Sequence, residues 1–396
     1  MRTAVVLSTL LSASLVAASP VQWPLGLLSK YQVWDNTQTA MDGYDIHEKR
    51  LVQFGENESP IWVSEWEKIK FKESGINFMD ITDTQDLGFS LFSGDSKRLS
   101  AVTYPSPNST ALVKKVIKSL STEGPLENLQ KFTSFTNRHY RSETGKQSQK
   151  WLLSKVDSLT KEYAPDSLLP FVSITEFPHK WGQNSIVAQI KGNSDELIII
   201  GAHQDSTSFL PFLPAPGADD DGSGTVTILE AYRALISSGI RPQKTVEFHW
   251  YAAEEGGLLG SRELAQDYER RGALVYAMQH FDMTAWVKKG TQEVVGILTD
   301  YTDSSLRKFV TELVDEYLSI PWADTQCGYA CSDHASWTQA GYPAMMAIES
   351  LFGDSNPNIH GSRDRLDISP EFSFTHMLEF SKLAVALVIE LGFPKE

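Results

Sequence analysis

The chain has 396 residues, 41% of them hydrophobic, and a formal net charge of −15 at pH 7. This length allows more than one domain without requiring it. The acidic balance argues against nucleic acid as a partner, because phosphate backbones are bound through basic surfaces, and it disfavours contact with anionic membranes.

Residues 1–19 predict a secretory signal peptide. Arg2 precedes an apolar run from Ala4 to Ala18, and small residues close this run just before Pro20. A membrane anchor is the alternative, but the run is shorter than the roughly 20 apolar residues that a spanning helix needs. We therefore expect a secreted, extracellular protein that makes no membrane contact.

Residues 20–88 are predicted to be a pro-segment, with a boundary that can lie anywhere within residues 80–104. Residues 20–100 show no set of alternating apolar strands, and the stretch 62–71 has helical spacing instead. The dibasic pair Lys97-Arg98 offers a processing site. A small N-terminal subdomain that the mature protein retains is the alternative interpretation.

Two further features bear on the compartment. Asn57 and Asn108 each begin an acceptor triplet for N-glycosylation. Cys327 and Cys331 are the two cysteines of the chain, and in a secreted protein a pair this close predicts a local disulfide. In a cytosolic protein the same pair would indicate metal or redox chemistry instead.

Residues 89–396 are predicted to form one domain of the α/β class. Apolar residues at helical spacing come first, and apolar strands then alternate with amphipathic helices. The expected helices are residues 109–121, 125–135, 146–163, 225–237, 258–271, 304–318 and 372–391, and the expected strands are residues 185–190, 197–202, 245–252, 274–281 and 343–348. Ser223 is a candidate N-cap for the helix at 225–237. The alternation predicts a mixed, mostly parallel central sheet with helices on both faces.

Polar residues follow three of these strands at the point where each strand ends. His203 comes directly after the strand at 197–202, Glu254 and Glu255 follow the strand at 245–252, and Asp282 follows the strand at 274–281. Sites in open α/β sheets lie outside the carboxyl ends of the strands. We therefore expect these side chains to gather at one edge of the sheet.

These residue types suit a pair of zinc ions. Zinc binds imidazole and carboxylate groups, and two neighbouring ions need a bridging carboxylate with further ligands on each side. We assign His203 and Asp282 to one metal, Glu255 and His360 to the other, and Asp220 to the bridge. Asp205 is placed to accept the second N–H of an imidazole. Glu254 is the candidate general base, which takes a proton from the attacking water and passes it to the leaving amine.

Other readings of the same residues remain open. Three successive aspartates at 219–221, beside Gly and Ser, are also typical of a solvated turn or a calcium-binding loop. His334, in the sequence Cys331-Ser-Asp-His334, is a second candidate for a polar site. His249 and His280 lie within predicted strands and are expected to pack there.

Five motifs together resemble the M28 family of zinc aminopeptidases, and within it the secreted fungal leucine aminopeptidases. They are Gly201-Ala-His-Gln-Asp-Ser206, Ala215-Pro-Gly-Ala-Asp-Asp-Asp-Gly-Ser-Gly224, Glu254-Glu-Gly-Gly-Leu-Leu-Gly-Ser261, Asp282-Met-Thr284 and Cys327-Gly-Tyr-Ala-Cys-Ser-Asp-His-Ala335. The resemblance implies two Zn²⁺ per chain held as assigned above, with Asp220 as the bridge, Glu254 as the base and a cystine at Cys327 and Cys331. It also implies a pro-segment that assists folding or holds activity down.

The resemblance further implies an apolar pocket beside the metals for the first side chain of the substrate. The matching positions in this chain are Met283, Leu298, Cys327, Tyr329, Cys331, Met346, Ile348, Phe352 and Ile359. Each of these residues, taken singly, is also typical of plain core.

The leading hypothesis is a secreted, monomeric metallo-aminopeptidase, with residues 89–396 as its catalytic domain. It would hydrolyse the first bond of peptides with a free N-terminus, prefer leucine or another bulky apolar first residue, and use a water held between two zinc ions. The alternatives are a glutaminyl cyclase-like transferase with one zinc, whose relatives lack a ligand at the position of His203, a carboxypeptidase of the same broad fold, and a receptor or carrier domain on a peptidase-like scaffold.

Overall fold

The computed structural model describes residues 45–56, 58–89, 102–208, 210 and 213–393. The predicted signal peptide, the pair Lys97-Arg98 and the acceptor Asn57 fall outside these residues, whereas Asn108 lies within them and is exposed. No helix in the described part of the chain combines the length and apolarity needed to cross a membrane.

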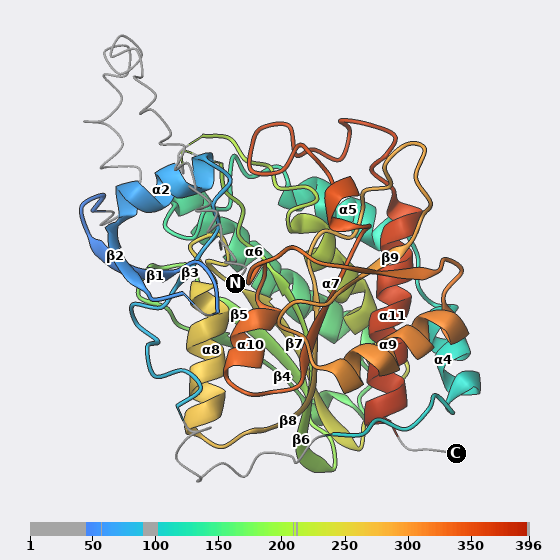
Figure 1. The fold of residues 1–396 in the computed structure, drawn as a ribbon. Helices are drawn as coiled ribbons and strands as arrows, with labels where there is room; N and C mark the ends of the chain where they lie inside the picture. Colours follow the sequence, from blue (N-terminus) through green and yellow to red (C-terminus); the bar gives the residue numbers. More distant parts are fainter. Residues whose placement is uncertain (1–44, 57, 90–101, 209, 211–212, 394–396) are drawn as a thin grey trace, which may run out of the picture.

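An eight-stranded mixed sheet forms the centre of the molecule (Figure 1), as the alternation predicted. Its strands run in the order β10-β9-β11-β8-β6-β7-β5-β4, and the pairs β10–β9, β11–β8, β8–β6 and β6–β7 are parallel. The strands are β4 Val172–Phe177, β5 Ser185–Ile190, β6 Ser194–His203, β7 Lys244–Tyr251, β8 Leu274–Phe281, β9 Val295–Leu298, β10 Trp322–Thr325 and β11 Ala344–Ile348. The parallel group β11-β8-β6-β7 lies in the middle, so its carboxyl ends share one edge.

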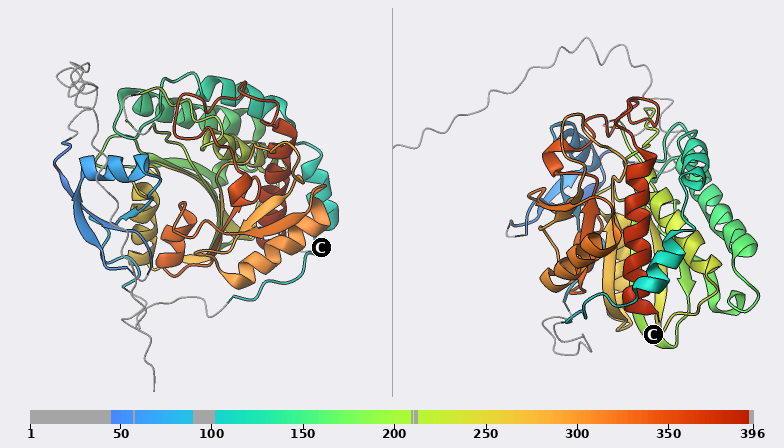
Figure 2. Two further views of the ribbon diagram at one scale, coloured as in Figure 1. Left: turned by 45° about the horizontal axis from the view of Figure 1, so that its top comes forward. Right: turned by 90° about the vertical axis from the view of Figure 1, so that its right-hand side faces the viewer.

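Helices cover both faces of this sheet (Figure 2). Ile198 and Ile200 of β6 belong to one apolar core and Leu197 and Ile199 to another, because successive side chains of a strand point to opposite faces. The first core contains side chains of α4 Thr110–Ile117, α5 Glu123–Phe132, α6 Glu143–Tyr163, α7 Gly222–Ser237, α9 Ser304–Tyr317 and α11 Phe374–Gly392, and the second those of α8 Leu259–Arg270 and α10 His334–Gln339. Short 3-10 turns occur at η2 Leu169–Phe171 and η3 Phe352–Asp354.

Residues 45–89 form a separate small unit, which we call the N-terminal unit. Three short strands, β1 Lys49–Gln53, β2 Ile61–Ser64 and β3 Met79–Asp80, pair antiparallel in the order β2-β1-β3, and α2 Glu65–Glu73 follows β2. The expectation of a segment without strands was therefore wrong, whereas the helical spacing at 62–71 is confirmed for residues 65–71, which lie in α2. The strands are too short to show a clear alternation, and a capping box at Ser64 starts the helix only at Glu65.

The N-terminal unit packs beside α8, close to the carboxyl edge of the sheet (Figures 1 and 2). The N–H of Asp80 donates to the carbonyl of Gly257 at 2.9 Å. Gly257 has a φ of 103°, and a Cβ atom there would lie 2.8 Å from the Asp80 nitrogen, so only glycine allows this approach. The Asp80 carboxylate accepts hydrogen bonds from Arg50 and Lys68. The contact with the domain is thus specific and reaches the segment that follows Glu255.

Two details of the domain differ from the sequence expectations. Asp221, not Ser223, caps α7, because its carboxylate accepts the N–H of Gly224 at 2.8 Å. The Ser223 hydroxyl donates instead to the carbonyl of Asp219. The elements β4, β9, β10 and α10 were not anticipated; the last three have four to six residues each, too few for a periodic pattern.

Candidate metal centre

Six polar side chains meet at the carboxyl edge of the central sheet. His203 is the last residue of β6, Glu254 and Glu255 follow β7, and Asp282 follows β8. Asp220 comes from the segment just before α7, and His360 from the loop between η3 and α11. Residues far apart in the sequence are therefore brought together by the topology of the sheet.

The ligand candidates fall into two groups that share Asp220. Asp220 Oδ1 lies 3.1 Å from His203 Nε2, and Asp220 Oδ2 lies 2.9 Å from His360 Nε2. Beyond these contacts, His203 Nε2 is 3.6 Å from Asp282 Oδ1, and His360 Nε2 is 3.3 Å from Glu255 Oε2. One carboxylate thus faces two imidazoles, one through each oxygen, and each imidazole has a second carboxylate beside it.

The donor atoms of this arrangement suit a cation. Both ring nitrogens of His203, Asp282 Oδ1 and Glu255 Oε1 are buried and have no hydrogen-bond partner among the described residues. Buried polar atoms are normally satisfied, and buried charges are paired or bind metals. Imidazole and carboxylate are ligands that zinc accepts. The residues present therefore fit a pair of zinc ions.

Asp221 also lies within metal-binding reach of His203 and Asp282. Its oxygens are already used, however, because Oδ2 accepts the N–H of His203 at 3.0 Å and Oδ1 accepts those of Gly224 and Met283. Asp221 thus ties together the segments that carry the candidate ligands. Asp220, by contrast, directs both oxygens toward imidazoles.

The chain turns sharply where the site residues emerge. Ala253, Met283 and His360 have φ values of 59°, 58° and 56°, in the left-handed region that non-glycine residues rarely adopt. Such backbone costs on the order of 1–3 kcal/mol for each residue and is found mainly at functional sites. At Ala253 and Met283 the turn lies directly beside Glu254 and Asp282.

Asp205 does more than the sequence predicted. Its Oδ1 lies 3.5 Å from His203 Nδ1, the place expected for a carboxylate that orients the imidazole. Its two oxygens also accept the backbone N–H groups of Glu254 and Glu255, at 3.0 and 3.2 Å. One buried side chain thereby positions His203 and the Glu254-Glu255 pair together.

The two adjacent glutamates differ in their ionisation. Burial raises the pKa of Glu254 well above its ordinary range, and the neighbouring Glu255 carboxylate adds to the rise. Burial also raises the pKa of Glu255, but His360 and Lys72 outweigh this effect and lower it to about 2. The protein therefore favours a proton on Glu254 over one on Glu255, as acid–base catalysis would require.

A mainly apolar pocket lies beside the candidate ligands. It is lined by Met283, Tyr329, Cys331, Met346, Ile348, Phe352 and Ile359, together with Lys72, Asn77 and Phe78 of the N-terminal unit. Leu298 does not line it but is fully buried in the apolar cluster behind it, where Cys327 also packs. Of the expected pocket residues, the structure therefore places Leu298 and Cys327 in the supporting layer.

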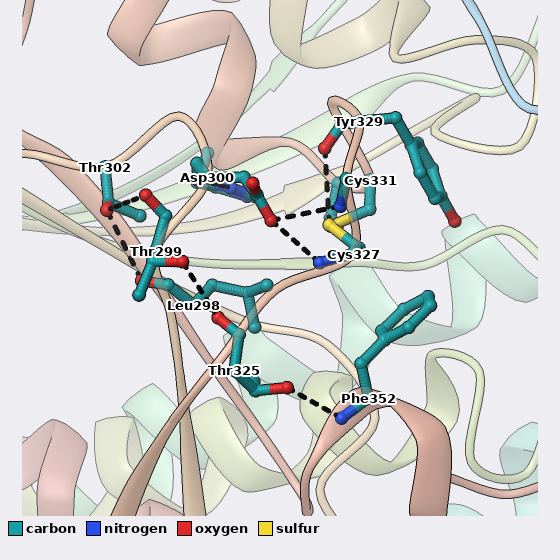
Figure 3. The surroundings of a disulfide bond; sticks show 12 residues. Leu298, Thr299, Asp300, Thr302, Thr325, Cys327, Tyr329, Cys331 and Phe352 are labelled. Atoms are coloured by element: carbon teal, nitrogen blue, oxygen red, sulfur yellow. Dashed lines mark hydrogen bonds between the residues drawn. A yellow bond between two sulfur atoms is a disulfide. The ribbon is translucent and has the colours of Figure 1, made fainter.

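A disulfide between Cys327 and Cys331 shapes one wall of this pocket (Figure 3), as the secreted-protein interpretation predicted. The Asp300 carboxylate accepts the N–H groups of Cys327 and Gly328, at 2.7 and 3.1 Å. The rings of Tyr329 and Phe352 meet edge to face at 6.3 Å. The loop is thus fixed at its base and presents Tyr329 at the pocket, against Phe352 of η3.

His334 and Lys72 differ in their relation to the candidate ligands. His334, the alternative candidate, is buried with Nε2 3.2 Å from the carbonyl of Asp300, and it belongs to neither ligand group. Lys72 was missed: its Nζ donates to Glu255 Oε2 at 2.8 Å, across 183 residues of sequence. The only signal in the sequence was its spacing of four residues from Lys68, which places both on one side of α2.

Comparisons with known proteins agree with this geometry. A sequence profile described as "Peptidase family M28" matches residues 185–384. "Leucine aminopeptidase 1" of Fusarium vanettenii is 46% identical to this chain over 346 residues, and the match covers 84% of this chain and 85% of that protein. The protein of the same name from Phaeosphaeria nodorum is 43% identical over 404 residues, and the match covers 98% of this chain and 98% of that protein. The crystal structure of the LapA aminopeptidase of Legionella pneumophila superimposes with a TM-score of 0.76 at 30% identity, covering 88% of this chain and 99% of that one.

Proposed function

Because the chain belongs to peptidase family M28, we propose that it is a secreted aminopeptidase that uses two zinc ions. Its substrates are peptides with a free N-terminus, and it prefers leucine or another bulky apolar first residue. The curated relatives cited above carry the name leucine aminopeptidase, which supports this reaction class. Secretion is supported by the signal-like residues 1–19 and by the disulfide.

The observation that carries the proposal is the position of Asp220 between two imidazoles. Its oxygens lie 3.1 Å from His203 and 2.9 Å from His360. We assign His203 and Asp282 to one zinc, Glu255 and His360 to the other, and Asp220 to both. Zinc ions held there would polarise the scissile carbonyl and lower the pKa of the attacking water.

The side chains around this centre divide the remaining work. Glu254 accepts a proton from the water and then donates it to the leaving amine, a role that suits a carboxyl group whose pKa burial has raised. The apolar side chains of the pocket bind the first side chain of the substrate. The carboxylates of Asp220, Glu254, Glu255 and Asp282 line the same pocket and favour a cationic α-amine.

The N-terminal unit acts as a built-in inhibitor in this proposal. Lys72 has a side chain that is 18% exposed and donates to Glu255 Oε2 at 2.8 Å, on the oxygen that faces His360. Asn77 and Phe78 of the same unit line the pocket. An ammonium group at this point opposes a cation bound by Glu255, and the unit narrows access for a peptide. Release of the unit removes both effects.

The proposal is tested by metal content and turnover on matched substrates. We expect about two zinc ions per chain, hydrolysis of leucyl-p-nitroanilide, and no hydrolysis of its N-acetyl derivative. Glu254→Gln should retain the metal and lose about 10²- to 10⁴-fold in kcat, whereas Glu127→Gln, at an exposed position, should match wild type. Turnover that survives exhaustive chelation would contradict the reaction, and one zinc per chain would contradict the pair.

A further inference from the structure

The segment that carries Asp220 is held through its N–H groups by one buried carboxylate. Asp364 is 1% exposed and accepts the N–H of Asp219 at Oδ1 and that of Asp220 at Oδ2, both at 3.0 Å. The carbonyl of Asp364 also accepts the N–H of Ala218 at 3.1 Å. A single residue therefore binds three successive peptide N–H groups of this segment.

Arg138 holds the same segment through its carbonyl groups. The guanidinium donates to Gly217 at 2.9 Å, to Pro216, and to Gln204, the neighbour of His203, at 2.9 Å. Arg138 is fully buried; burial lowers its pKa to about 10, and Asp364 is the foremost of the carboxylates that oppose this effect. Arg138 thus stays charged at neutral pH, and hydrogen bonds from charged groups are about twice as strong as neutral ones.

Asp364 also connects two parts of the ligand set. It follows His360 by four residues, and His360 Nε2 lies 2.9 Å from Asp220 Oδ2. The segment with His360 and the segment with Asp220 are therefore joined twice, once through the ligand side chains and once through peptide N–H groups. The second connection leaves both oxygens of Asp220 available to face the ligand site, because Asp364 accepts a hydrogen bond only from the backbone N–H of that residue.

We propose that Asp364 is a positioning residue, which clamps the peptide groups of Asp219 and Asp220 and thereby fixes the Asp220 carboxylate between His203 and His360. The inference rests on the proposed function, because it gives Asp364 a part in the geometry of that metal site. Asp364 does not line the pocket, so it has no contact with a substrate there. Its effect reaches the reaction only through Asp220.

The test compares Asp364→Asn with Asp367→Asn in the full chain. The carboxamide of D364N would turn an NH₂ group toward a backbone N–H, so one of the two hydrogen bonds is lost. Asp367 lies three residues further on, is exposed and pairs with Arg365 at 2.7 Å, which makes it the matched control. We expect D364N to bind zinc about 10- to 100-fold more weakly, to show a shifted absorption spectrum at saturating Co²⁺, and to lose kcat for leucyl-p-nitroanilide with KM within about twofold. D367N should match wild type in all three.

A D364N protein with native near-UV circular dichroism and the metal affinity and cobalt spectrum of D367N would overturn the inference. If D364N does not fold, hydrogen exchange of the wild-type chain decides: the clamp predicts slow exchange of the Asp219 and Asp220 amides before metal is added, and fast exchange refutes it. A wild-type chain that binds no zinc would instead refute the proposed function, so the two failures are distinguishable.

Discussion

Replacing Lys72 with methionine should convert the uncut chain into a better metal binder and a faster enzyme. Lys72 donates to Glu255 Oε2 at 2.8 Å, and although burial lowers its pKa, Glu255 and Glu254 raise it above the usual value. The side chain therefore stays a cation at any pH suited to the assay. Methionine keeps most of its length and apolar stem but removes the charge.

The size of the effect follows from that one contact. A hydrogen bond to a charged group contributes about 1.5–3 kcal/mol, which corresponds to roughly a 10- to 150-fold change in an equilibrium constant. Without Lys72, Glu255 regains a free oxygen and its full negative charge. We therefore expect Lys72→Met to bind zinc at least about tenfold more tightly than wild type, and to show a higher kcat/KM on leucyl-p-nitroanilide before any cleavage of the N-terminal unit.

The assay is a zinc competition titration against a chromophoric chelator, with turnover measured on the same samples. Lys70→Met is the control, because Lys70 lies in the same helix, is exposed and contacts the Trp66 ring. Equal zinc affinity and equal turnover of K72M and K70M would refute the idea that Lys72 restrains the site. Equal zinc affinity of the wild-type chain before and after proteolytic removal of the N-terminal unit would refute it as well.

Three more perturbations test separate parts of the site and fold. In Asp220→Asn a single carboxamide oxygen replaces the two carboxylate oxygens that face the two imidazoles, so one metal would lose a ligand. Elemental analysis should therefore find fewer than two zinc ions per chain, and an undiminished zinc content would contradict the role of Asp220 as the bridge. Burial raises the pKa of Asp80, but the two buried cations that pair with it outweigh this effect and hold the pKa below the usual range. The stability that this pairing contributes is present above the unfolded-state pKa of about 3.9 and is lost as the pH falls further. The melting temperature should therefore drop below about pH 4, and it should drop less in Asp80→Asn. Replacing both Cys327 and its partner with serine loosens one pocket wall, and KM for leucyl-p-nitroanilide should rise roughly fivefold, the equivalent of about 1 kcal/mol, with an unchanged KM counting against a role in the pocket.

The strand ends could be predicted from the sequence because apolar runs and their limits are local features. The run at 197–202 ends directly before His203, and the structure ends β6 at that residue. Two of the closing helices also match within two residues. Strands such as β9, with four residues, carry no such pattern, because burial against neighbouring strands rather than periodicity determines them.

The three successive aspartates show where local reasoning ends. Asp219 accepts hydrogen bonds from Ala285 and Asn356, Asp220 faces two imidazoles, and Asp221 caps α7. Their side chains are chemically identical, and only contacts with distant segments give them different surroundings. Spacing alone could not distinguish them, and the family resemblance was needed to support the choice of Asp220. Asp364 was not predicted for the same reason, since 144 residues separate it from Asp220.

The buried carboxylates around the site divide into two classes, and this division explains why Lys72 matters. Asp205, Asp221 and Asp364 each accept backbone N–H groups with both oxygens, so their hydrogen-bonding capacity is used within the protein. Asp282 and Glu255 each keep a buried oxygen without any hydrogen-bond partner in the described part of the chain. Both of these residues are candidate metal ligands, and at Glu255 Oε2 the chain supplies a cation of its own, Lys72. Since an ammonium group and a divalent ion would both be attracted to the Glu255 carboxylate, we expect their binding to be antagonistic, and we expect removal of the N-terminal unit to strengthen the metal site.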